Sequence, residues 1–476
     1  MKKKSNYLIV ILLISLIIFS YSIKLTHYSI SIDNEIFLND AHGMIKDWYQ
    51  LGRFGLGFYK YIFNNYNLNI MLTSFLSLII LFAAAFLFAR DIAKKFSKDH
   101  FLLNIFIIVG FILTAPVLTD QFIFTMQMLE VSISYLLLVI AFIMINRVIY
   151  QKKYYLLIFI MPLLFLIFGT YQAFYLLYIA FSNIYFISYT KEKEISIKEQ
   201  FSIIIKYILI FFCGMIGSFI INKIVLNVFH ITNSSYLTNQ ILYFRRPFIY
   251  CFLHIGKYMF DVLFGKFPFF NFSYLIGIIF LFKYLKTRQF KYKFSIIPYL
   301  FLIFVPFLFT VIFGNGTLNR IQFALPVIIS FIFVLSLNNQ KKVVYLIPII
   351  FIIIQSIITF FLYQGDYKRY KKDINVAYQI KEVIEEYPGK PIVFVGTISP
   401  VAKIRGETIG NSFFNWDYDT EFGSNYRIHG FLNALEINYP APSLEQIKKV
   451  DEIYNSLNKK VTVYQDILVV VLDYYN

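Results

Sequence analysis

The chain has 476 residues, of which 58% are hydrophobic and 15% are charged, with a formal net charge of +17. Soluble globular proteins have about 45–50% apolar and about 25% charged residues, so this composition excludes an ordinary soluble fold. The positive charge lies in short segments between long apolar runs, which excludes nucleic-acid binding as its explanation and indicates a membrane protein.

The first apolar run, residues 7–20, follows the basic segment MKKK. No small-residue cleavage site closes this run, so we predict a retained first helix and not a cleaved signal peptide. Apolar runs of about 18 residues or more match a hydrocarbon core about 30 Å thick. On this basis we predict about eleven transmembrane helices. They are centred near residues 14, 80, 109, 137, 161, 179, 216, 278, 304, 330 and 353.

The distribution of lysine and arginine predicts the orientation of these helices, because cytoplasmic loops carry an excess of both. MKKK places the N-terminus inside, and with eleven spans every second loop is then also inside. These loops are the basic ones: residues 89–100, 146–155, 191–200, 283–294 and 338–342. Three longer segments then face outside: residues 24–68, residues 229–270 and the region from about 364 onward.

The first outward segment contains three carboxylates within eight residues, Asp33, Glu35 and Asp40, and Arg53 follows them in GRFG. Carboxylates at a membrane boundary can act as a general base, a metal ligand or the partner of a cation. The alternative is a solvated loop with ordinary acidic residues.

Two further acidic residues follow the third span. Asp120 lies at the tip of a short outward turn, and Glu130 lies at the start of the next apolar run. A carboxylate just inside an apolar run is costly, so we expect Glu130 to face a wet cavity or a partner. The alternative is an interfacial residue that reaches water.

Three arginines lie in the later outward segments. Arg245 and Arg246 are adjacent in an aromatic-rich segment, where a guanidinium can grip a phosphate with two hydrogen bonds. Arg320 opens the tenth span at an outward end, where the positive-inside rule does not call for a cation. We expect phosphate binding at these positions, and the alternative is interfacial anchoring.

The C-terminal region is more charged than the rest of the chain and shows the patterns of a small α/β domain. Residues 366–387 have apolar positions at helical spacing, and Pro388–Gly389 ends that helix. A strand at 391–398, a helix with Ser443 and Gln446 in a capping box, and a hairpin turning at Gln465–Asp466 follow. We therefore predict a transmembrane domain at 1–363 and an extracytoplasmic α/β domain at 364–476.

Cofactor motifs are missing from the sequence. It contains no Walker or dinucleotide-binding loop, and no cluster in the C-terminal region has metal-ligand spacing. An energy-coupled pump with its own nucleotide site is therefore not expected. No cofactor is assigned, and a divalent metal stays an open alternative.

Several segments resemble the Gtr-type (O-antigen glucosyltransferase-like) family, polytopic membrane glycosyltransferases of the GT-C superfamily. The segments are SIDNEIF and LGRFG in the first outward loop, TDQFIFTMQMLE, GTYQAFY and GNGTLNRIQFALP. The resemblance covers most of the membrane region and little of the C-terminal region. It implies a GT-C-like α-helical fold in the bacterial cytoplasmic (plasma) membrane, with the active site on the extracytoplasmic face.

The resemblance also implies a reaction. The enzyme would move a hexose, glucose by analogy, from a polyprenyl-phosphate-linked donor to a surface polysaccharide or cell-wall glycopolymer, with inversion at the anomeric carbon. Asp33 and Glu35 would be catalytic. Asp120, Glu130 and Asp40 would be the acceptor or second acidic element, and Arg320, Arg245, Arg246 and Arg53 would bind the donor phosphate. Because the loop reads Asp-Asn-Glu and not Asp-Asp, the identity of the base stays open between Asp33 and Glu35.

A flippase or transporter for lipid-linked sugars is the main alternative, and a surface polysaccharide polymerase is another. Transporters of this kind carry polar residues in mid-span and internal repeats. The predicted spans here are almost purely aliphatic and aromatic in the middle, and their polar residues gather at the outer ends. This pattern favours the transferase.

Overall fold

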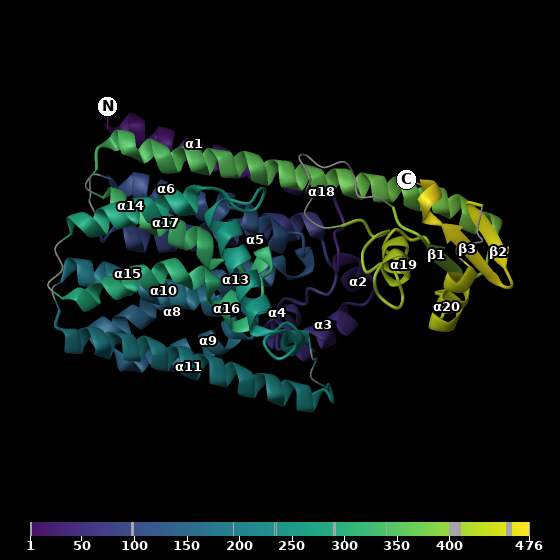
Figure 1. Ribbon diagram of the computed structural model, residues 1–476, viewed down its shortest axis with the longest axis horizontal. Coiled ribbons are helices and arrows are strands. Elements are labelled where there is room, and N and C mark those ends of the chain that lie inside the picture. Colours follow the sequence, from purple (N-terminus) through teal and green to yellow (C-terminus); the bar gives the residue numbers. More distant parts are fainter. Residues whose placement is uncertain are drawn as a thin grey trace.

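The computed structural model of the chain describes residues 2–96, 100–193, 195–232, 234, 236–288, 292–338, 340–398, 411–453 and 459–475. Most of these residues form helices, which lie side by side in an elongated bundle (Figure 1). The bundle helices are α1 (Lys2–Thr26), α5 (Ile70–Ala93), α6 (Phe101–Thr114), α8 (Thr125–Gln151), α9 (Leu157–Phe168), α10 (Ala173–Glu192), α11 (Ile197–Val228), α14 (Ser273–Thr287), α15 (Ile297–Phe304), α16 (Leu308–Phe313), α17 (Ala324–Leu337) and α18 (Leu346–Glu386). We call the end of the bundle at which α1 begins the basic end.

Shorter elements lie mainly at the opposite end of the bundle, together with the C-terminal region (Figure 1). They are α2 (Asn34–Asn39), α3 (Ala41–Gln50), α4 (Phe54–Phe63), α7 (Pro116–Phe122), α12 (Tyr236–Asn239) and α13 (Phe248–Leu263). Short 3-10 turns complete the helical part: Tyr154–Leu156, Lys293–Ile296, Val305–Phe307, Asn319–Ile321 (η5), Lys342–Tyr345 and Leu472–Tyr475.

Within the described residues, seven helical segments are long and apolar enough to cross a membrane. They are Tyr7–Thr26, Ile70–Ala93, Thr125–Gln151, Ala173–Lys191, Ile197–Val228, Phe294–Phe313 and Lys342–Glu386. An eighth span results if α6 and α7, which meet at an angle of 47°, are counted together. The bend follows from Pro116 at the first position of α7, because a proline disfavours helical geometry in the residue before it.

The sequence predicts eleven spans, and each of the eleven centres lies in a helix or in the α15–α16 segment. However, α9, α14 and α17 have only 12, 15 and 14 residues. At 1.5 Å per residue they are about 18–23 Å long, shorter than a hydrocarbon core of about 30 Å. The number eleven and the GT-C assignment therefore stay predictions, whereas the polytopic helical character is confirmed.

The outer surfaces of the bundle are apolar, as a bilayer requires. Leu209, Phe219 and Ile224 of α11 are all more than half exposed, and Leu8 and Ile11 of α1 are equally uncovered. By contrast, every residue of the interior helix α17 is buried. Large aliphatic and aromatic side chains on an uncovered helix face are stable in lipid and costly in water.

The longest helix, α18, joins the bundle to the C-terminal region. It has 41 residues and is therefore about 60 Å long, twice the thickness of a hydrocarbon core. Its second half continues past the bundle and lies beside the C-terminal elements (Figure 1). The helix runs without a break through residue 363, where the sequence predicts a domain boundary, and the two-domain division stays a prediction.

The C-terminal region contains a three-stranded sheet in the order β1-β3-β2 and two helices. The elements are β1 (Ile392–Val395), α19 (Asn425–Ala434), α20 (Leu444–Ile453), β2 (Val461–Tyr464) and β3 (Ile467–Val471). β1 pairs parallel to β3, with Ile392 opposite Leu468, and β2 pairs antiparallel to β3 in a hairpin. The predicted strand and hairpin are thus confirmed, and so is the capping box, in which Ser443 and Gln446 exchange hydrogen bonds of 2.8 and 3.2 Å.

The sheet is covered on both faces. Val393, Val469 and Val471 pack with Ile447 and Val450 of α20 in a small core. The opposite-facing residues of β1 and β3 belong to the main core, which includes the apolar side chains of α19. Burial on both faces explains why β1 and β3 are continuous apolar runs without polar alternation.

Candidate functional site

The two carboxylates of the SIDNEIF segment meet one arginine from the C-terminal region. Nη1 of Arg427 donates to Oδ1 of Asp33 at 2.8 Å and to Oε1 of Glu35 at 2.9 Å. Nε of Arg427 donates to Oδ2 of Asp417 at 2.7 Å. We call these four residues the Arg427 cluster. The first outward segment and α19 therefore build one polar site.

Burial differs strongly within the Arg427 cluster. The side chain of Glu35 is fully buried, that of Asp33 is 26% exposed and that of Asp417 is 36% exposed. Burial raises the pKa of Glu35 to about 8, although Arg427 opposes this shift. Burial also lowers the pKa of Arg427, but the surrounding carboxylates outweigh it and leave that pKa raised. Within the described part of the chain, Oε2 of the buried Glu35 accepts no hydrogen bond.

The backbone of Asp33 is in the left-handed region, with φ of 68°. This conformation costs a non-glycine residue about 1 kcal/mol or more, although aspartate tolerates it better than most residues. Asp33 occupies the N-cap position of α2 but makes no capping hydrogen bond, since its carboxylate meets Arg427. The strained backbone at Asp33 thus directs its side chain toward Arg427.

Asn34, between the two carboxylates, fixes the segment to the bundle. Its Nδ2 donates to the carbonyl of Ile123 at 2.8 Å, and its Oδ1 accepts from the backbone N–H of Met126 at 3.0 Å. The side chain is fully buried. Both ends of the amide thus bind the turn between α7 and α8, which lies within the TDQFIFTMQMLE motif.

A second arginine, Arg369, binds the backbone just before the SIDNEIF segment. Arg369 of α18 donates to Oδ1 of Asp366 at 3.1 and 3.0 Å and to Oδ2 of Asp373 at 2.8 Å. It also donates to the carbonyl of Ile30 at 2.9 Å. All three charged side chains are at most 2% exposed. We call Arg369, Asp366 and Asp373 the Arg369 cluster.

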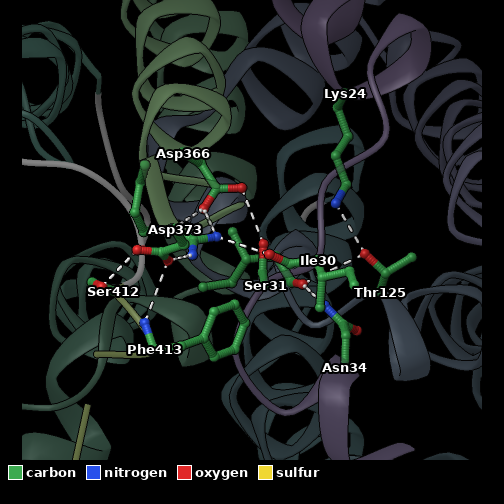
Figure 2. A network of polar contacts seen from close by, with 11 residues as sticks. Lys24, Ile30, Ser31, Asn34, Thr125, Asp366, Asp373, Ser412 and Phe413 are labelled. Atoms are coloured by element: carbon green, nitrogen blue, oxygen red, sulfur yellow. Dashed lines mark hydrogen bonds and ion pairs between the residues drawn. The ribbon is translucent and has the colours of Figure 1, made fainter. Parts of the chain in front are cut away.

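Figure 2 shows Asp366 and Asp373 between Ser31 on one side and Ser412 on the other. Ser31 donates to Asp366 at 3.0 Å, and Ser412 donates to Asp373 at 2.6 Å. The backbone N–H of Phe413 also donates to Asp373, at 3.4 Å. On the far side of the loop, Lys24 donates to Thr125 at 2.9 Å (Figure 2). The Arg369 cluster therefore ties the first loop and residues 412–413 to one helix.

Asp120 and Arg320, predicted from separate loops, lie together. The backbone N–H of Arg320, in η5, donates to Oδ2 of Asp120 at 3.1 Å. The guanidinium of Arg320 lies 4.7 Å from the ring centre of Phe124. Phe124 belongs to the turn that Asn34 grips, so Arg320 and Asp120 adjoin the segment that carries Asp33 and Glu35.

Glu130 has a partner, as its position in the sequence requires. Nζ of Lys60 in α4 lies 2.8 Å from Oε1 of Glu130, and both side chains are fully buried. The same ammonium lies 4.8 Å from the ring centre of Phe37 in α2. Buried charges are tolerated when paired, so this ion pair locks α4 and α2 against α8.

Arg53 links two of the family-like motifs. Its Nε donates to Oε1 of Gln172 at 3.2 Å, and its guanidinium lies 4.8 Å from the ring centre of Tyr171. The neighbouring Gly55 permits close packing, since its N–H donates to the carbonyl of Gly169 at 2.7 Å. A Cβ at Gly55 would approach the side chain of Thr170 to 2.4 Å. LGRFG and GTYQAFY therefore pack as one unit.

Three predicted residues lie apart from the Arg427 cluster. Asp40 caps α3, accepting from the backbone N–H of Gly43 at 2.8 Å. Arg245 is exposed and donates to Asn239, and Arg246 is exposed with its guanidinium 5.6 Å from the ring centre of Tyr250. Residues 248–263, within the predicted outward segment 229–270, form the helix α13.

A groove of about 1030 Å³ lies between α3, α4, α9 and α11. Its walls are mainly aliphatic and aromatic, and His42 and Lys46 are its imidazole and ammonium groups. Ile158 and Phe159 of α9 line the groove and are also exposed on the outer surface. The groove includes Phe54, the residue after Arg53.

No group of three or more His, Cys, Asp or Glu side chains in the described ranges has an arrangement suited to a metal ion. In the Arg427 cluster a guanidinium lies where a cation between the carboxylates would lie. Metal dependence therefore stays open.

Sequence reasoning did not identify Arg427, Asp417, Lys60 or the Arg369 cluster. Arg427 is 394 residues from Asp33, and nothing in its local sequence distinguishes it from other surface arginines. Lys60 did leave a signal, because it is the lysine of the otherwise apolar helix FGLGFYKYIF. A lysine within an apolar helix needs a carboxylate as partner, and Glu130 within an apolar run needs a cation.

A family model described as glucosyl transferase GtrII matches residues 22–337, about two thirds of the chain. The match includes Asp33, Glu35, Lys60, Glu130 and Arg320 and ends before α18 and Arg427. No curated protein and no solved structure matches the chain.

Proposed function

The chain belongs to the GtrII glucosyl transferase family, and from this premise we propose a specific reaction. The protein moves glucose from a polyprenyl-phosphate-linked donor to a surface polysaccharide or cell-wall glycopolymer. The reaction takes place on the outer face of a bacterial plasma membrane, at the end of the bundle that carries the Arg427 cluster. The helices of membrane length, the apolar groove and the clustered carboxylates support this proposal.

The observation that carries the proposal is the meeting of Asp33 and Glu35 at Arg427. Asp33 is partly exposed, whereas Glu35 is fully buried, so an acceptor hydroxyl reaches the carboxylate of Asp33 more readily. Asp33 is therefore the proposed base. Glu35 orients Arg427 beside it.

The proposed step balances as a single displacement. The acceptor hydroxyl gives its proton to the carboxylate of Asp33, and its oxygen bonds to the anomeric carbon of glucose. The bond between that carbon and the phosphate oxygen breaks, and the electron pair leaves with the lipid phosphate. One displacement inverts the anomeric configuration, in agreement with the expectation from the GT-C resemblance.

The leaving lipid phosphate gains negative charge, which guanidinium groups stabilise. Arg320 is the first candidate, because it adjoins the turn that Asn34 holds beside Asp33. Arg53 is the second candidate, because the next residue, Phe54, lines the apolar groove. Arg245 and Arg246 lie farther along the chain on an exposed segment and are the weaker candidates.

The apolar groove suits the polyprenyl chain of the donor. Its volume of about 1030 Å³ and its mainly aliphatic and aromatic walls match a long hydrocarbon better than a sugar. α3 and α4 form one wall and belong to the same loop as Asp33 and Arg53. A lipid seated there would have its phosphate near the first outward segment.

The test is glucosyl transfer from radiolabelled polyprenyl-phosphate glucose in membranes that contain the full chain. We expect Asp33→Asn to lower the rate by about 10²- to 10⁴-fold, the usual contribution of a general base. Asp47→Asn is the matched control, because Asp47 is an exposed carboxylate of α3 in the same outward segment and has no role in the proposed site, so transfer should persist. Normal transfer by Asp33→Asn, Glu35→Gln and the double variant would remove the reaction from this loop. A flippase would move the labelled lipid across vesicles without consuming it.

A further inference from the structure

A polar pocket, separate from the apolar groove, lies at the basic end of the bundle, opposite the Arg427 cluster. It has a volume of about 530 Å³ and is formed where α10, α14 and α17 end. Lys191 of α10, Lys283 of α14 and Arg288, the residue after α14, line it. The proposed transfer uses no residue of this pocket.

The described lining of the pocket carries positive charge. Its described lining residues include three cations and no carboxylate. Each helix C-terminus contributes only about half a negative charge, so three such ends offset about half of the positive charge of the cations. The pocket therefore favours an anion.

Ser336 supplies an independent indication of a ligand. Its side chain lines the pocket, is only 7% exposed and lies one residue before the end of α17. Among the described residues, its hydroxyl has no hydrogen-bond partner. A buried hydroxyl without a partner costs about 1–3 kcal/mol, and an oxygen atom of a bound ligand would satisfy it.

The remaining walls of the pocket combine apolar side chains with the polar ones of Thr287, Asn338 and Gln340. Phe280, Leu335 and Val344 contribute to them, and Phe282 on the same helix is 51% exposed on the outer surface of the bundle. A site that combines cations, a hydroxyl and apolar walls beside a lipid-facing surface suits an amphiphile with an anionic head. We propose that this pocket binds the phosphate headgroup of an anionic phospholipid from the adjoining leaflet.

The test uses the purified full-length chain in detergent and counts bound lipid by native mass spectrometry. Phosphatidylglycerol should bind better than phosphatidylcholine, which carries the same phosphate with a compensating positive charge. Lys283→Gln should weaken phosphatidylglycerol binding about fivefold, the usual effect of one cation at a membrane surface. Ser336→Ala should also weaken it, and it should not lower the melting temperature, because the lost hydroxyl has no partner in the empty pocket.

Lys286→Gln is the matched control, since Lys286 is an exposed lysine of the same helix that does not line the pocket. Its binding should equal that of the wild type. Equal binding of both lipids, or equal losses for Lys286→Gln and Lys283→Gln, would overturn the proposal. A parallel titration with inorganic phosphate distinguishes a lipid headgroup from free phosphate as the ligand. Displacement of the lipid by phosphate at millimolar concentration supports a phosphate-binding site. Binding of phosphate without any preference between the two lipids overturns the assignment to a lipid.

Discussion

The molecule contains two arginine–carboxylate clusters at the same end of the bundle, and they differ in how completely they are satisfied. In the Arg369 cluster, all four oxygens of Asp366 and Asp373 accept hydrogen bonds, and the charged groups are at most 2% exposed. In the Arg427 cluster, Asp33 and Asp417 are partly exposed, and Oε2 of Glu35 accepts no hydrogen bond among the described residues.

This difference is the basis on which we propose a structural role for the Arg369 cluster and a chemical role for the Arg427 cluster. The Arg369 cluster uses two carboxylates of one helix, each about one turn from Arg369, so its geometry is set within a single helix. The Arg427 cluster takes its carboxylates from distant segments, holds Asp33 in a strained backbone and leaves a carboxylate oxygen unpaired. A satisfied buried network mainly rigidifies, whereas strain and an unpaired group suggest a site that awaits a substrate.

The largest expected effect is on stability, from Arg369→Gln. Removing the guanidinium leaves Asp366 and Asp373 buried without a cation, which costs about 3–5 kcal/mol. Unfolding of the detergent-solubilised protein should show this loss. Arg427→Gln should cost less, because two of its three carboxylates, those of Asp33 and Asp417, are partly exposed. Equal destabilisation by the two variants would break the distinction between the clusters.

A smaller loss of stability is expected from Ser412→Ala. The hydroxyl of Ser412 donates to Oδ1 of Asp373 at 2.6 Å, and a hydrogen bond to a buried charged group contributes about 1.5–3 kcal/mol. The same unfolding measurement checks it. Ser443→Ala, which removes an exposed helix cap outside both clusters, gives the reference for a serine hydroxyl at the surface.

Arg427→Gln should affect transfer more than stability. Without the guanidinium, Asp33 and Glu35 lose the donor that both of them bind, and the base loses its position, so we expect kcat to fall by about 10- to 100-fold. Arg427→Lys keeps the charge but loses the forked geometry and should restore only part of the rate. A wild-type rate in Arg427→Gln would show that the cluster has no part in the reaction.

The last effect, spread over several pH units, is a pH dependence of stability from Glu35. Burial raises its pKa from 4.5 to about 8 in the folded chain, so the folded state binds the extra proton. The free energy of unfolding is then highest below the unfolded pKa and falls as pH rises from about 4.5 to 8, by at most about 1.4 kcal/mol per pH unit. Glu35→Gln should remove this slope, and an unchanged slope would assign it to other groups.

The elements that local patterns determine could be predicted from the sequence. The apolar runs, the strand at 392–395, the hairpin at Gln465–Asp466 and the Ser443–Gln446 cap all depend on neighbouring residues, and the structure contains them. The continuity of α18 was missed, because the sequence becomes charged near residue 366 while its helical periodicity continues. The change in composition near residue 366 therefore does not end the helix.

The candidate site could be predicted only in part. Asp33, Glu35, Asp120 and Arg320 were identified because carboxylates and arginines at outward helix ends are unusual in an apolar chain. Which of them meet is decided by tertiary packing, and Arg427 comes from the region that the family match does not reach. Its position beside Asp33 follows from the tertiary fold and not from the local sequence.

The unbroken course of α18 sets a rotational phase between the bundle and the C-terminal region. Each residue of a helix adds about 100° of rotation and 1.5 Å of rise. A one-residue insertion before Asp366 would therefore turn the Arg369 cluster, and the segment bound to it, by more than a quarter of a circle. A seven-residue insertion would nearly restore the angle but raise the attached segment by about 10 Å. Length changes in this helix are consequently constrained both in angle and in height, whatever the inserted residues are.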